Sequence, residues 1–309
     1  LWFNGLGEFF YRNGIKTDID SFVSIDSPEQ KNIPQCEDYV SSGIEIVPVG
    51  GGKDSAVTTE LLHPFGDKLR FFTVNDQPAR TQCVLAGGYS EDKIIKIYRT
   101  IDPELLKLNA EGFLNGHTPF SSVVAFISMY AGFIEGANDV ILSNESSANE
   151  SNIGGESVNH QYSKSFEFER DFDEFRRRNF PQSAVYFSLL RPFCELQIAK
   201  QFSQYKQYHP IFRSCNRGSK KNIWCCECPK CLFVAIMLSP FLPPDELNSI
   251  FGCDMLAKTK LETDFDGLCG FTGLKPFECV GTADEVVLAL TLTAEKYRKS
   301  GLGMPALLR

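Results

Sequence analysis

The stretch of residues 44–58, IEIVPVGGGKDSAVT, constrains the fold of this chain more than any other. It begins as a run of apolar, β-branched residues that is typical of a buried strand, and it continues into three glycines and a helix start. Glycines permit positive φ angles and let backbone N–H groups approach a ligand, while a helix N-terminus adds unpaired donors. The sequence therefore predicts a strand, a tight loop and a helix that together bind an anion, and we expect this anion to be phosphate.

The residues after the three glycines exclude the commonest phosphate loop. A Walker A loop requires G-x-x-x-x-G-K-[ST]. Here Val47 occupies the position of the first glycine, and Asp54 occupies the position of the serine or threonine after Lys53. The segment GGGKDS instead resembles the PP-loop of the ATP pyrophosphatase group, S-G-G-x-D-S, with glycine in place of the first serine. A turn without a ligand is the alternative. We call residues 50–55 the glycine loop.

The PP-loop resemblance implies that ATP is cleaved between its α and β phosphates. It assigns the pyrophosphate to the N–H groups of the glycines and to Ser55, and the accompanying Mg²⁺ to Asp54. The nucleotide-binding residues that it predicts are Gly50, Gly51, Gly52, Lys53, Asp54 and Ser55.

Composition restricts the classes of protein to which the chain can belong. Its 309 residues are 43% hydrophobic, which is enough for a sizeable core in one large domain or two. Because the net charge is −8, we expect no nonspecific binding of nucleic acid. Because no apolar run approaches 18 residues and no signal peptide opens the chain, we expect a cytoplasmic protein without a membrane partner. Four of the 11 cysteines crowd together, which favours a metal site in a reducing compartment over disulfides.

The order of strands and helices predicts an α/β domain over residues 41–205. Strands are expected at residues 44–49, 69–74, 93–98 and 140–143, and helices between them at residues 78–86 and 119–134. This alternation is typical of a parallel sheet with helices on both faces, where ligands lie at the carboxyl ends of the strands. Residues 1–40 read as a short helix ended by Gly14 and a polar stretch, and we expect them to be the remnant of an N-terminal region, since the chain begins without methionine.

A long polar loop follows the last of these strands, over residues 143–170. It is either a solvated surface loop or part of a site, and its position beyond a strand end favours a site. His160, Lys164 and Glu167 are its titratable candidates, and a charged helix with the basic run RRR follows to residue 179. Arg191, which is polar within an apolar run, either clamps an anionic substrate or forms a salt bridge in the core.

Cysteine spacing predicts a structural zinc site in the C-terminal part of the chain. Cys215, Cys225, Cys228 and Cys231 form C-x9-C-x2-C-x2-C, whose last three residues suit a zinc knuckle. Redox-active thiols and buried free cysteines are the alternatives, and Cys226 has the wrong spacing to join the set. We expect residues 206–309 to form a mainly helical zinc-knuckle subdomain, with helices near residues 231–238 and 284–300 and loop sequence between them.

One segment within that expected loop carries further chemistry. The sequence GLKPFECVG, residues 273–281, contains Lys275, Glu278 and Cys279, which either form a catalytic set or belong to a loop that Phe277 packs. The residues alone do not decide between these two interpretations.

Eight motifs in order resemble the ATP-dependent UDP-N-acetylmuramoyl-L-alanyl-L-glutamate epimerase family of peptidoglycan synthesis. They extend over residues 44–281 and read VPVGGGKDS, LNGHTP, LSNESSAN, VNHQYSKSFEFER, YFSLLRPF, YHPIFRSCN, WCCECPKC and KPFECVG. The chain departs from the family in lacking most of an additional N-terminal region and in having Cys226 where a small residue such as glycine is expected. The implied fold is a PP-loop domain of the adenine nucleotide alpha hydrolase-like (HUP) type.

The resemblance implies an enzyme that turns the terminal L-Glu of a UDP-muramoyl dipeptide into D-Glu. Joining the glutamate carboxylate to AMP would neutralise it, so that its Cα proton can be removed and returned from the other face. Two side chains on opposite faces or one mobile base are needed. The candidates are His160, Lys164, Glu167, Lys275, Glu278 and Cys279.

Two other functions compete with this interpretation. The glycine loop and the cysteines by themselves would equally suit a nucleobase-modifying ATP pyrophosphatase similar to 7-cyano-7-deazaguanine synthase, or one that thiolates tRNA. The acidic composition argues mildly against an RNA substrate. A nucleotide sensor that binds ATP without turnover is the third possibility. The oligomeric state is not predicted by the sequence.

Overall fold

The computed structural model describes residues 1–27, 39–153 and 158–309. Residues 28–38 of the N-terminal stretch and residues 154–157 of the polar loop lie outside the described residues. A five-stranded sheet of order β3-β2-β1-β4-β5 forms the centre, and all its neighbouring strands are parallel. Its strands are β1 (Ile44–Pro48), β2 (Leu69–Val74), β3 (Ile94–Ile97), β4 (Ala137–Leu142) and β5 (Val185–Ser188). The predicted α/β class with a parallel sheet is confirmed.

The central strand β1 determines where a ligand can bind. Val47 pairs with Phe71 of β2 on one side, and Ile46 pairs with Val140 of β4 on the other. The order of the strands reverses between β1 and β4, and loops that leave an open parallel sheet at such a point diverge and leave a crevice at the carboxyl ends. The glycine loop follows β1 and the polar loop follows β4, so both open at this crevice.

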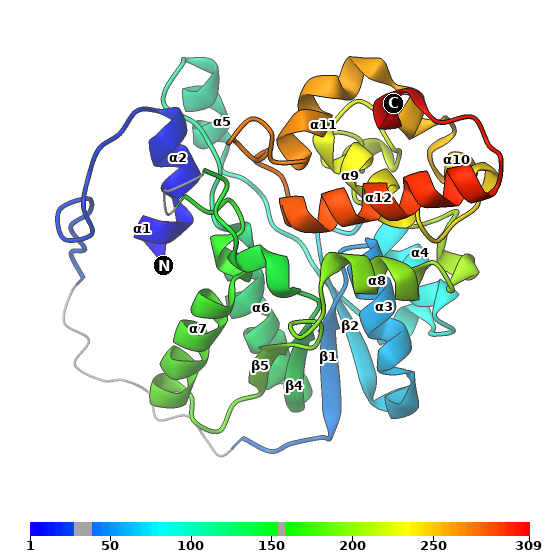
Figure 1. Ribbon diagram of the computed structural model, residues 1–309. Helices are drawn as coiled ribbons and strands as arrows, with labels where there is room; N and C mark the ends of the chain where they lie inside the picture. Colours follow the sequence, from blue (N-terminus) through cyan, green and yellow to red (C-terminus); the bar gives the residue numbers. More distant parts are fainter. Residues whose placement is uncertain (28–38, 154–157) are drawn as a thin grey trace.

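Helices cover both faces of the sheet (Figure 1). One face carries α3 (Lys53–Leu61), α4 (Pro78–Ala86) and α8 (Glu195–Phe202), and the other carries α6 (Phe120–Glu135) and α7 (Phe166–Asn179). Side chains alternate between the faces of a strand, so Val47 belongs to the core of the first face and Ile46 to that of the second. A further helix, α5 (Pro103–Ala110), connects β3 to α6.

The C-terminal part is helical, but it contains more helix than the sequence analysis expected. Its helices are α9 (Pro229–Leu238), α10 (Pro244–Phe251), α11 (Glu262–Leu268) and α12 (Ala283–Lys299). The expectation of loop sequence between the first and the last of these was wrong. Helix α10 has proline at its first position, acidic residues in its first turn and Gly252 after its end at φ 74°, and it buries Leu247, Ile250 and Phe251. These local start and stop signals were present in the sequence.

Two short helices open the chain, α1 (Trp2–Gly5) and α2 (Gly7–Arg12). Gly14 follows them at φ 64°, as expected of a residue that ends a helix. The polar loop is their neighbour, because Asn4 donates a hydrogen bond to Glu167 at 3.2 Å and Glu8 contacts His160. The N-terminal stretch therefore contacts the loop that follows β4.

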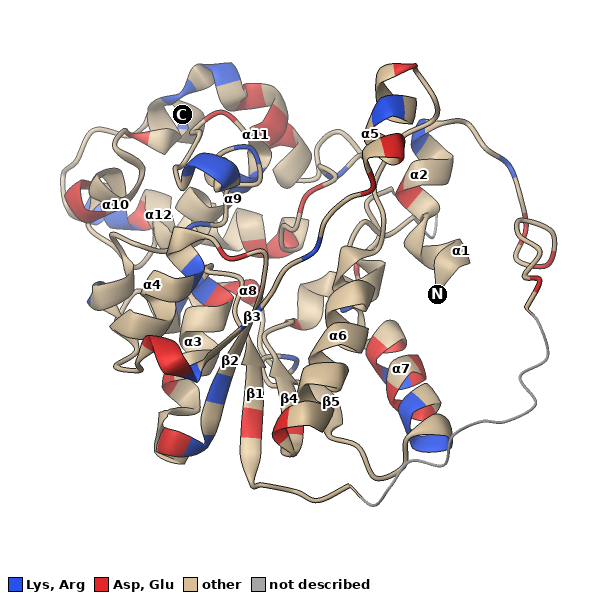
Figure 2. Ribbon diagram, turned by 180° about the vertical axis from the view of Figure 1, so that it is seen from behind, with Lys and Arg blue, Asp and Glu red and all other residues tan. Residues whose placement is uncertain are grey.

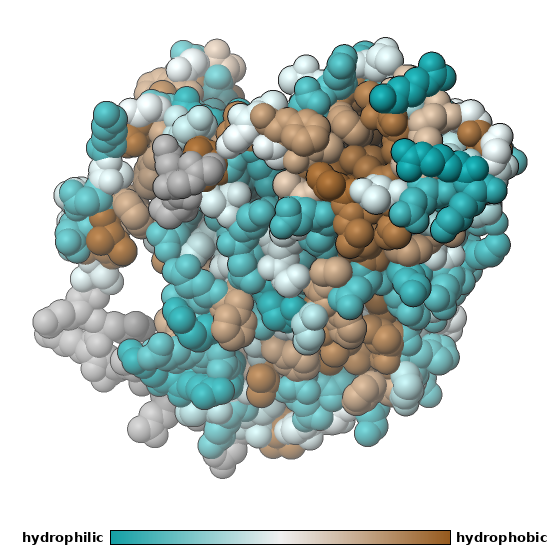
Figure 3. Space-filling model, in the orientation of Figure 1, coloured by the Kyte–Doolittle hydropathy of each residue, from teal (hydrophilic) through white to brown (hydrophobic). Residues whose placement is uncertain are grey.

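Charged and apolar side chains are arranged differently on the surfaces of α7 and α12. The basic run at the end of α7 is paired along its own helix, with Arg176 and Arg177 contacting Asp173 and Arg178 contacting Glu174. Figure 2 shows this mixture of acidic and basic residues on α7. Apolar residues gather on the face of α12 that Figure 3 displays, where Val287, Leu288 and Leu292 are exposed. Among the described residues, no helix is both long and apolar enough to cross a bilayer.

Candidate active site

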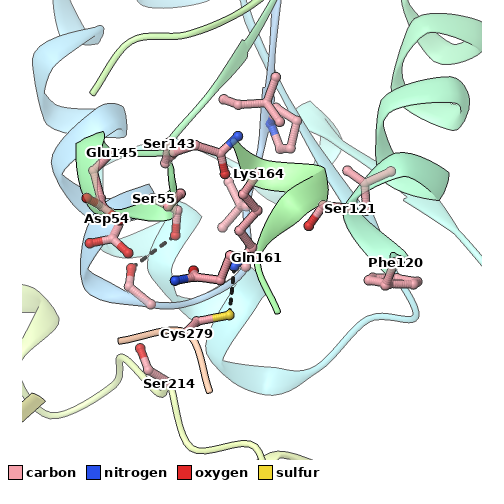
Figure 4. Close-up of a pocket in the computed structure, with 18 of the residues that line it drawn as sticks. Asp54, Ser55, Phe120, Ser121, Ser143, Glu145, Gln161, Lys164, Ser214 and Cys279 are labelled. Atoms are coloured by element: carbon pink, nitrogen blue, oxygen red, sulfur yellow. Dashed lines mark hydrogen bonds between the residues drawn. The ribbon is translucent and has the colours of Figure 1, made fainter. Parts of the chain in front are cut away.

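A cavity of about 300 Å³ lies at the carboxyl ends of β1 and β4. Its wall combines the glycine loop, the start of the polar loop, Lys164 and, from a distant part of the chain, Cys279. Figure 4 shows Asp54, Ser55 and Glu145 on one side of this cavity and Lys164 with Cys279 on another. The parallel sheet thus places the two loops where the sequence analysis expected them, on one edge.

The glycine loop is shaped by two close approaches of its backbone. Gly51 has φ 79°, and a Cβ atom there would lie 3.1 Å from the backbone of residues 79 and 80. A Cβ atom on Gly52 would lie 2.7 Å from the hydroxyl oxygen of Ser214. Gly50 has no neighbour within 4 Å of such an atom, and it faces the cavity. The first glycine leaves room for a ligand, and the other two permit the fold of the loop.

The six predicted nucleotide-binding residues do not all face the cavity. Gly50, Gly52, Asp54 and Ser55 line it. Lys53 is 1% exposed and is not a lining residue, and its ammonium group contacts the carboxylates of Asp54 and Glu195. Burial by itself raises the pKa of Asp54, but Lys53 and Lys230 outweigh burial and hold that pKa below its ordinary value. Lys53 therefore keeps Asp54 ionised rather than contacting the cavity.

Two further carboxylates that the sequence analysis did not single out line the cavity. Glu145 follows β4 and caps the next turn, where its carboxylate accepts a hydrogen bond from the hydroxyl of Ser147 at 2.8 Å. Glu195 begins α8. Burial raises the pKa of both carboxyl groups, that of Glu195 to about 7. Together with Asp54 they supply the hard oxygen donors that Mg²⁺ prefers.

Lys164 and Cys279 form a close pair on the wall of the cavity, since the Lys164 Nζ atom lies 3.0 Å from the Cys279 Sγ atom. Burial by itself raises the pKa of Cys279, but Lys164, His160 and Lys230 together lower it to about 5. Lys164 in turn has a raised pKa, chiefly because of the Cys279 thiolate. The pair is therefore a thiolate and an ammonium ion at neutral pH.

Backbone pairing brings Cys279 to this position from 115 residues away. The Lys275 N–H group donates to the Asn152 carbonyl oxygen at 2.9 Å, and the Asn152 side chain donates to the carbonyl oxygen of Pro276 at 3.0 Å. Gln161 donates to the carbonyl oxygen of Val280 at 3.3 Å. The segment 273–281 thus lies along the polar loop, and neither segment alone reveals this pairing.

Cationic side chains complete the cavity wall. Lys230, the second residue of α9, lines the cavity and donates to the carbonyl oxygen of Cys279. Arg80 of α4 and Arg213 are further lining residues. The Arg213 N–H group donates to the carbonyl oxygen of Gly51 at 2.8 Å, which ties the glycine loop to the C-terminal part. Such cations suit the phosphates of a nucleotide.

The other acid–base candidates occupy different places. Glu167 is exposed on α7, Lys275 forms an ion pair with Glu150 at 2.5 Å, and Glu278 contacts Asn216. His160 lies behind Cys279, outside the lining residues, with its Nδ1 atom against Glu8. Of the six candidates, only Lys164 and Cys279 line the cavity.

The four predicted metal ligands converge. One ligand atom from each of Cys215, Cys225, Cys228 and Cys231 lies within 4.8 Å of the other three. Tetrahedral Zn–S bonds of about 2.3 Å place sulfur atoms roughly 3.8 Å apart, and the Cys225 and Cys231 sulfurs are separated by 3.8 Å. The Gly218 N–H group also donates to the Cys215 sulfur at 3.1 Å, as suits a thiolate. The donor set fits a structural zinc ion.

The structure suggests structural roles for Arg191 and Cys226. Arg191 donates to Glu169 at 2.8 Å and to the carbonyl oxygen of Glu145 at 2.7 Å, which favours its interpretation as a salt-bridged arginine. Cys226 has φ 55°, a left-handed conformation that glycine adopts most easily, and its thiol lies 3.3 Å from the carbonyl oxygen of Phe251. This left-handed conformation explains why glycine is the residue expected at this position of the family.

Sequence reasoning also missed residues that only packing brings to the site. Glu8 lies in a stretch where no chemistry was visible, and Lys230 stands inside the cysteine motif, which was interpreted as a metal site alone. His117 belongs to the motif LNGHTP, and its ring centroid lies 4.1 Å from that of His160. A sequence does not show which charged residues become buried together, so Glu8 could not have been found in this way. The motifs that contain Lys230 and His117 could have marked these two residues as candidates.

Comparisons with known proteins agree with these motifs. Residues 1–189 match the model of the MurL N-terminal domain, and residues 211–304 match that of the MurL C-terminal domain. A relative from Xanthomonas oryzae pv. oryzae is 35% identical over 304 residues, and one from Micromonospora sp. is 35% identical over 303 residues. Both are named UDP-N-acetyl-alpha-D-muramoyl-L-alanyl-L-glutamate epimerase.

These relatives are longer than the present chain. Each match covers 96% of this chain but only 66% of the relative, so the chain spans about two thirds of their length. The first family model alone extends over more than half of the chain. The sheet, the glycine loop and the cysteine cluster all lie within matched residues, and the chain belongs to the MurL family.

Proposed function

We propose that this chain catalyses the ATP-dependent epimerisation of the terminal L-Glu of UDP-N-acetylmuramoyl-L-alanyl-L-glutamate, in the cytoplasm. The named activity of its relatives supports this proposal. The observation that carries it is the Lys164–Cys279 pair on the wall of the cavity that also contains Asp54, Ser55 and Glu145. One cavity thus combines groups suited to a nucleotide with a group suited to proton abstraction.

The nucleotide half of the site would act as a PP-loop. The backbone and Ser55 hydroxyl of the glycine loop would bind the departing pyrophosphate, with Arg80, Arg213 and Lys230 as cations near the phosphates. Asp54, Glu145 and Glu195 would hold Mg²⁺, which would supply positive charge to the phosphate oxygens. The substrate carboxylate attacks the α-phosphorus of ATP, a new O–P bond forms, and pyrophosphate leaves.

The proton-transfer half would use the thiolate of Cys279 as the base. Once the glutamate carboxylate is an acyl-adenylate, its negative charge no longer opposes loss of the Cα proton. The Cys279 thiolate takes this proton, and the Lys164 ammonium ion, 3.0 Å from the sulfur, balances the charge that moves to the enolate. Reprotonation on the opposite face, followed by hydrolysis of the acyl–phosphate bond by water, releases AMP and the UDP-muramoyl dipeptide with a terminal D-Glu.

The distance within the pair limits how it can act. A Cα atom needs about 3–3.5 Å to each reacting group, so a contact of 3.0 Å leaves no room for it between sulfur and nitrogen. Lys164 and Cys279 therefore serve the same face of the substrate in this conformation. The opposite face requires either a turn of the planar enolate or a second proton donor.

The cysteine cluster would hold one structural zinc ion. With four thiolates as ligands the ion would have no open position for a water molecule, so its contribution would be to hold the start of α9 and, with it, Lys230. The boundaries proposed from the sequence, residues 41–205 and 206–309, would then describe a nucleotide-binding domain and a subdomain that closes the cavity from the other side.

Incubation with ATP, Mg²⁺ and the UDP-muramoyl dipeptide in deuterated water tests the proposal. Deuterium at the glutamate Cα together with release of AMP is the expected result. AMP release without Cα deuterium would instead support the nucleobase-modifying or tRNA-thiolating alternative, whose substrates would then be tried. Binding of ATP without release of AMP would support a sensor.

A further inference from the structure

The imidazole of His160 lies near the Cys279 thiolate but is not part of the cavity wall. Burial by itself lowers the pKa of His160, but the nearby Cys279 and Glu8 outweigh burial and raise that pKa to about 9. The Nδ1 atom is the one that contacts the carboxylate of Glu8. The His160 ring therefore contacts the carboxylate of Glu8 and lies close to the Cys279 thiolate.

Glu8 is a buried carboxylate whose surroundings hold it in place. It lies on α2 and is only 5% exposed, and both of its oxygen atoms have partners. One accepts a hydrogen bond from the Arg12 Nε atom at 2.5 Å, and the other faces His160. A buried carboxylate that receives one N–H group of an imidazole fixes the orientation of the ring and so the direction of its second N–H group.

We propose that Glu8 is a positioning residue, which holds His160 against Cys279 so that helix α2 completes the proton-transfer site. The proposal goes beyond the function proposed above, on which it rests only for the identity of the reaction. The three groups come from three segments of the chain. The carboxylate belongs to α2, the imidazole to the polar loop and the thiolate to the segment 273–281. Truncation of the first helices would therefore change chemistry, not only packing.

A metal ion is the competing explanation for this cluster. Ligand atoms of Glu8, His117 and His160 lie within 4.8 Å of one another. However, Arg12 occupies the second oxygen of Glu8, the two imidazole rings lie against each other with centroids 4.1 Å apart, and Lys164 adds positive charge nearby. These neighbours favour the positioning role, and the test below distinguishes the two.

The charged groups around the thiolate determine what a change at Glu8 should do. The cations Lys164, His160 and Lys230 and the carboxyl group of Glu278 lie near Cys279. Glu8, His117 and Cys279 lie near His160. Replacing Glu8 by glutamine removes the charge that keeps His160 cationic and oriented, so the thiolate loses one of its three stabilising neighbours. The pKa of Cys279 then rises toward that of an ordinary thiol. Below the midpoint, each unit of that rise lowers the thiolate fraction tenfold.

The experiment is peptide-resolved alkylation of Cys279 by iodoacetamide as a function of pH, with intact folding checked by circular dichroism. In Glu8→Gln we expect the midpoint to move upward by about one pH unit and the alkylation rate near pH 5 to fall by roughly fivefold. Glu174→Gln, an exposed change further along α7, is the control and should leave the profile unchanged. No substrate is needed, so failure of the epimerase proposal would not disturb this readout.

A second variant separates positioning from a structural effect. If Glu8 acts through His160, the change Glu8→Gln should add nothing in a His160→Gln background, where the midpoint is already raised. His160→Gln also serves if Glu8→Gln does not fold. An unchanged midpoint in folded Glu8→Gln or His160→Gln would overturn the proposal. So would loss of a second bound metal ion from Glu8→Gln, because the cluster would then be a metal site.

Discussion

Asp54 illustrates how a single residue can be essential without supporting the fold. Its carboxylate lines the cavity and is kept ionised by Lys53 and Lys230, whereas the adjacent core is formed by other side chains. We predict that Asp54→Asn lowers AMP release by at least about 10²-fold with an unchanged circular dichroism spectrum. Asp67→Asn, at a fully exposed side chain, is the matched control. AMP release at the wild-type rate would remove Asp54 from the mechanism.

The thiolate–ammonium pair makes a distinct prediction about the two halves of the reaction. Replacing Cys279 by serine, or Lys164 by methionine, should reduce Cα deuterium exchange by about 10²–10⁴-fold. AMP formation should fall less, because neither side chain belongs to the glycine loop. Both rates are measured in the same incubation.

Changes at the two candidates that lie outside the cavity provide the comparison. Glu167→Gln and Lys275→Met should retain both rates, since neither residue is among those that line the cavity. Equal loss of AMP formation and exchange in the Cys279 variant would mean that this residue positions the nucleotide or the acyl-adenylate.

Protonation of Cys279 gives the reaction a predictable acid limit. Its pKa is lowered to about 5, so the thiolate is present above this pH and is lost as the pH falls through it. Cα exchange should therefore be retained from neutral pH down to about pH 6 and should decline below pH 5. A decline centred near pH 8–9, the range of an ordinary thiol, would contradict this assignment.

At the scale of elements, the glycine loop offers a matched pair of substitutions. Alanine at Gly51 must adopt φ 79° with its Cβ atom 3.1 Å from backbone atoms, whereas alanine at Gly50 meets nothing within 4 Å. Gly51→Ala should lower the free energy of unfolding by about 1–3 kcal/mol. Gly50→Ala should leave it nearly unchanged while crowding the ligand. Chemical denaturation measures the free energy of unfolding of both variants. Equal values for Gly51→Ala and Gly50→Ala would mean that the loop can relax around the added methyl group.

The zinc knuckle connects a second element to the site, because Lys230 lies between two of its cysteines. We predict one zinc ion per chain by elemental analysis, retained in Cys226→Ser and lost in Cys228→Ser. Loss of zinc should also slow Cα exchange, since the first turn of α9 holds Lys230 against the backbone of Cys279. Metal-free protein with all four thiols reactive would rule out the site.

At the scale of the whole molecule, the core does not stop at the predicted domain boundary. One cluster of buried residues joins Val47 of β1 and Phe202 of α8 to Phe233 of α9 and Ala289 of α12. The boundary at residue 205 stays a prediction, but this shared core implies that residues 41–205 alone would expose a large apolar surface. We expect that fragment to aggregate or to bind hydrophobic dyes, whereas the full chain should not.

Much of the fold was predictable because it depends on neighbours in sequence. Strand β2 and helix α4 begin and end where periodicity and local signals predicted them, and α7 ends at the predicted residue 179. The glycine loop could be placed at the end of β1 because glycine and helix-start chemistry are local. Helices α10 and α11 were missed, although α10 carries start and stop signals, because helices this short are marginal until they pack against a core.

The sequence by itself determined the strand–loop–helix unit of residues 44–58, the spacing of four cysteines and the set of motifs that resemble one family. Only the tertiary structure selected Lys164 and Cys279 from six candidates, joined Glu8 to His160 and paired the buried Lys53 with Asp54 and Glu195. The reason is physical: turns, caps and ligand spacings are encoded within a few residues. By contrast, the partner of a buried charge is chosen by packing between segments more than 100 residues apart.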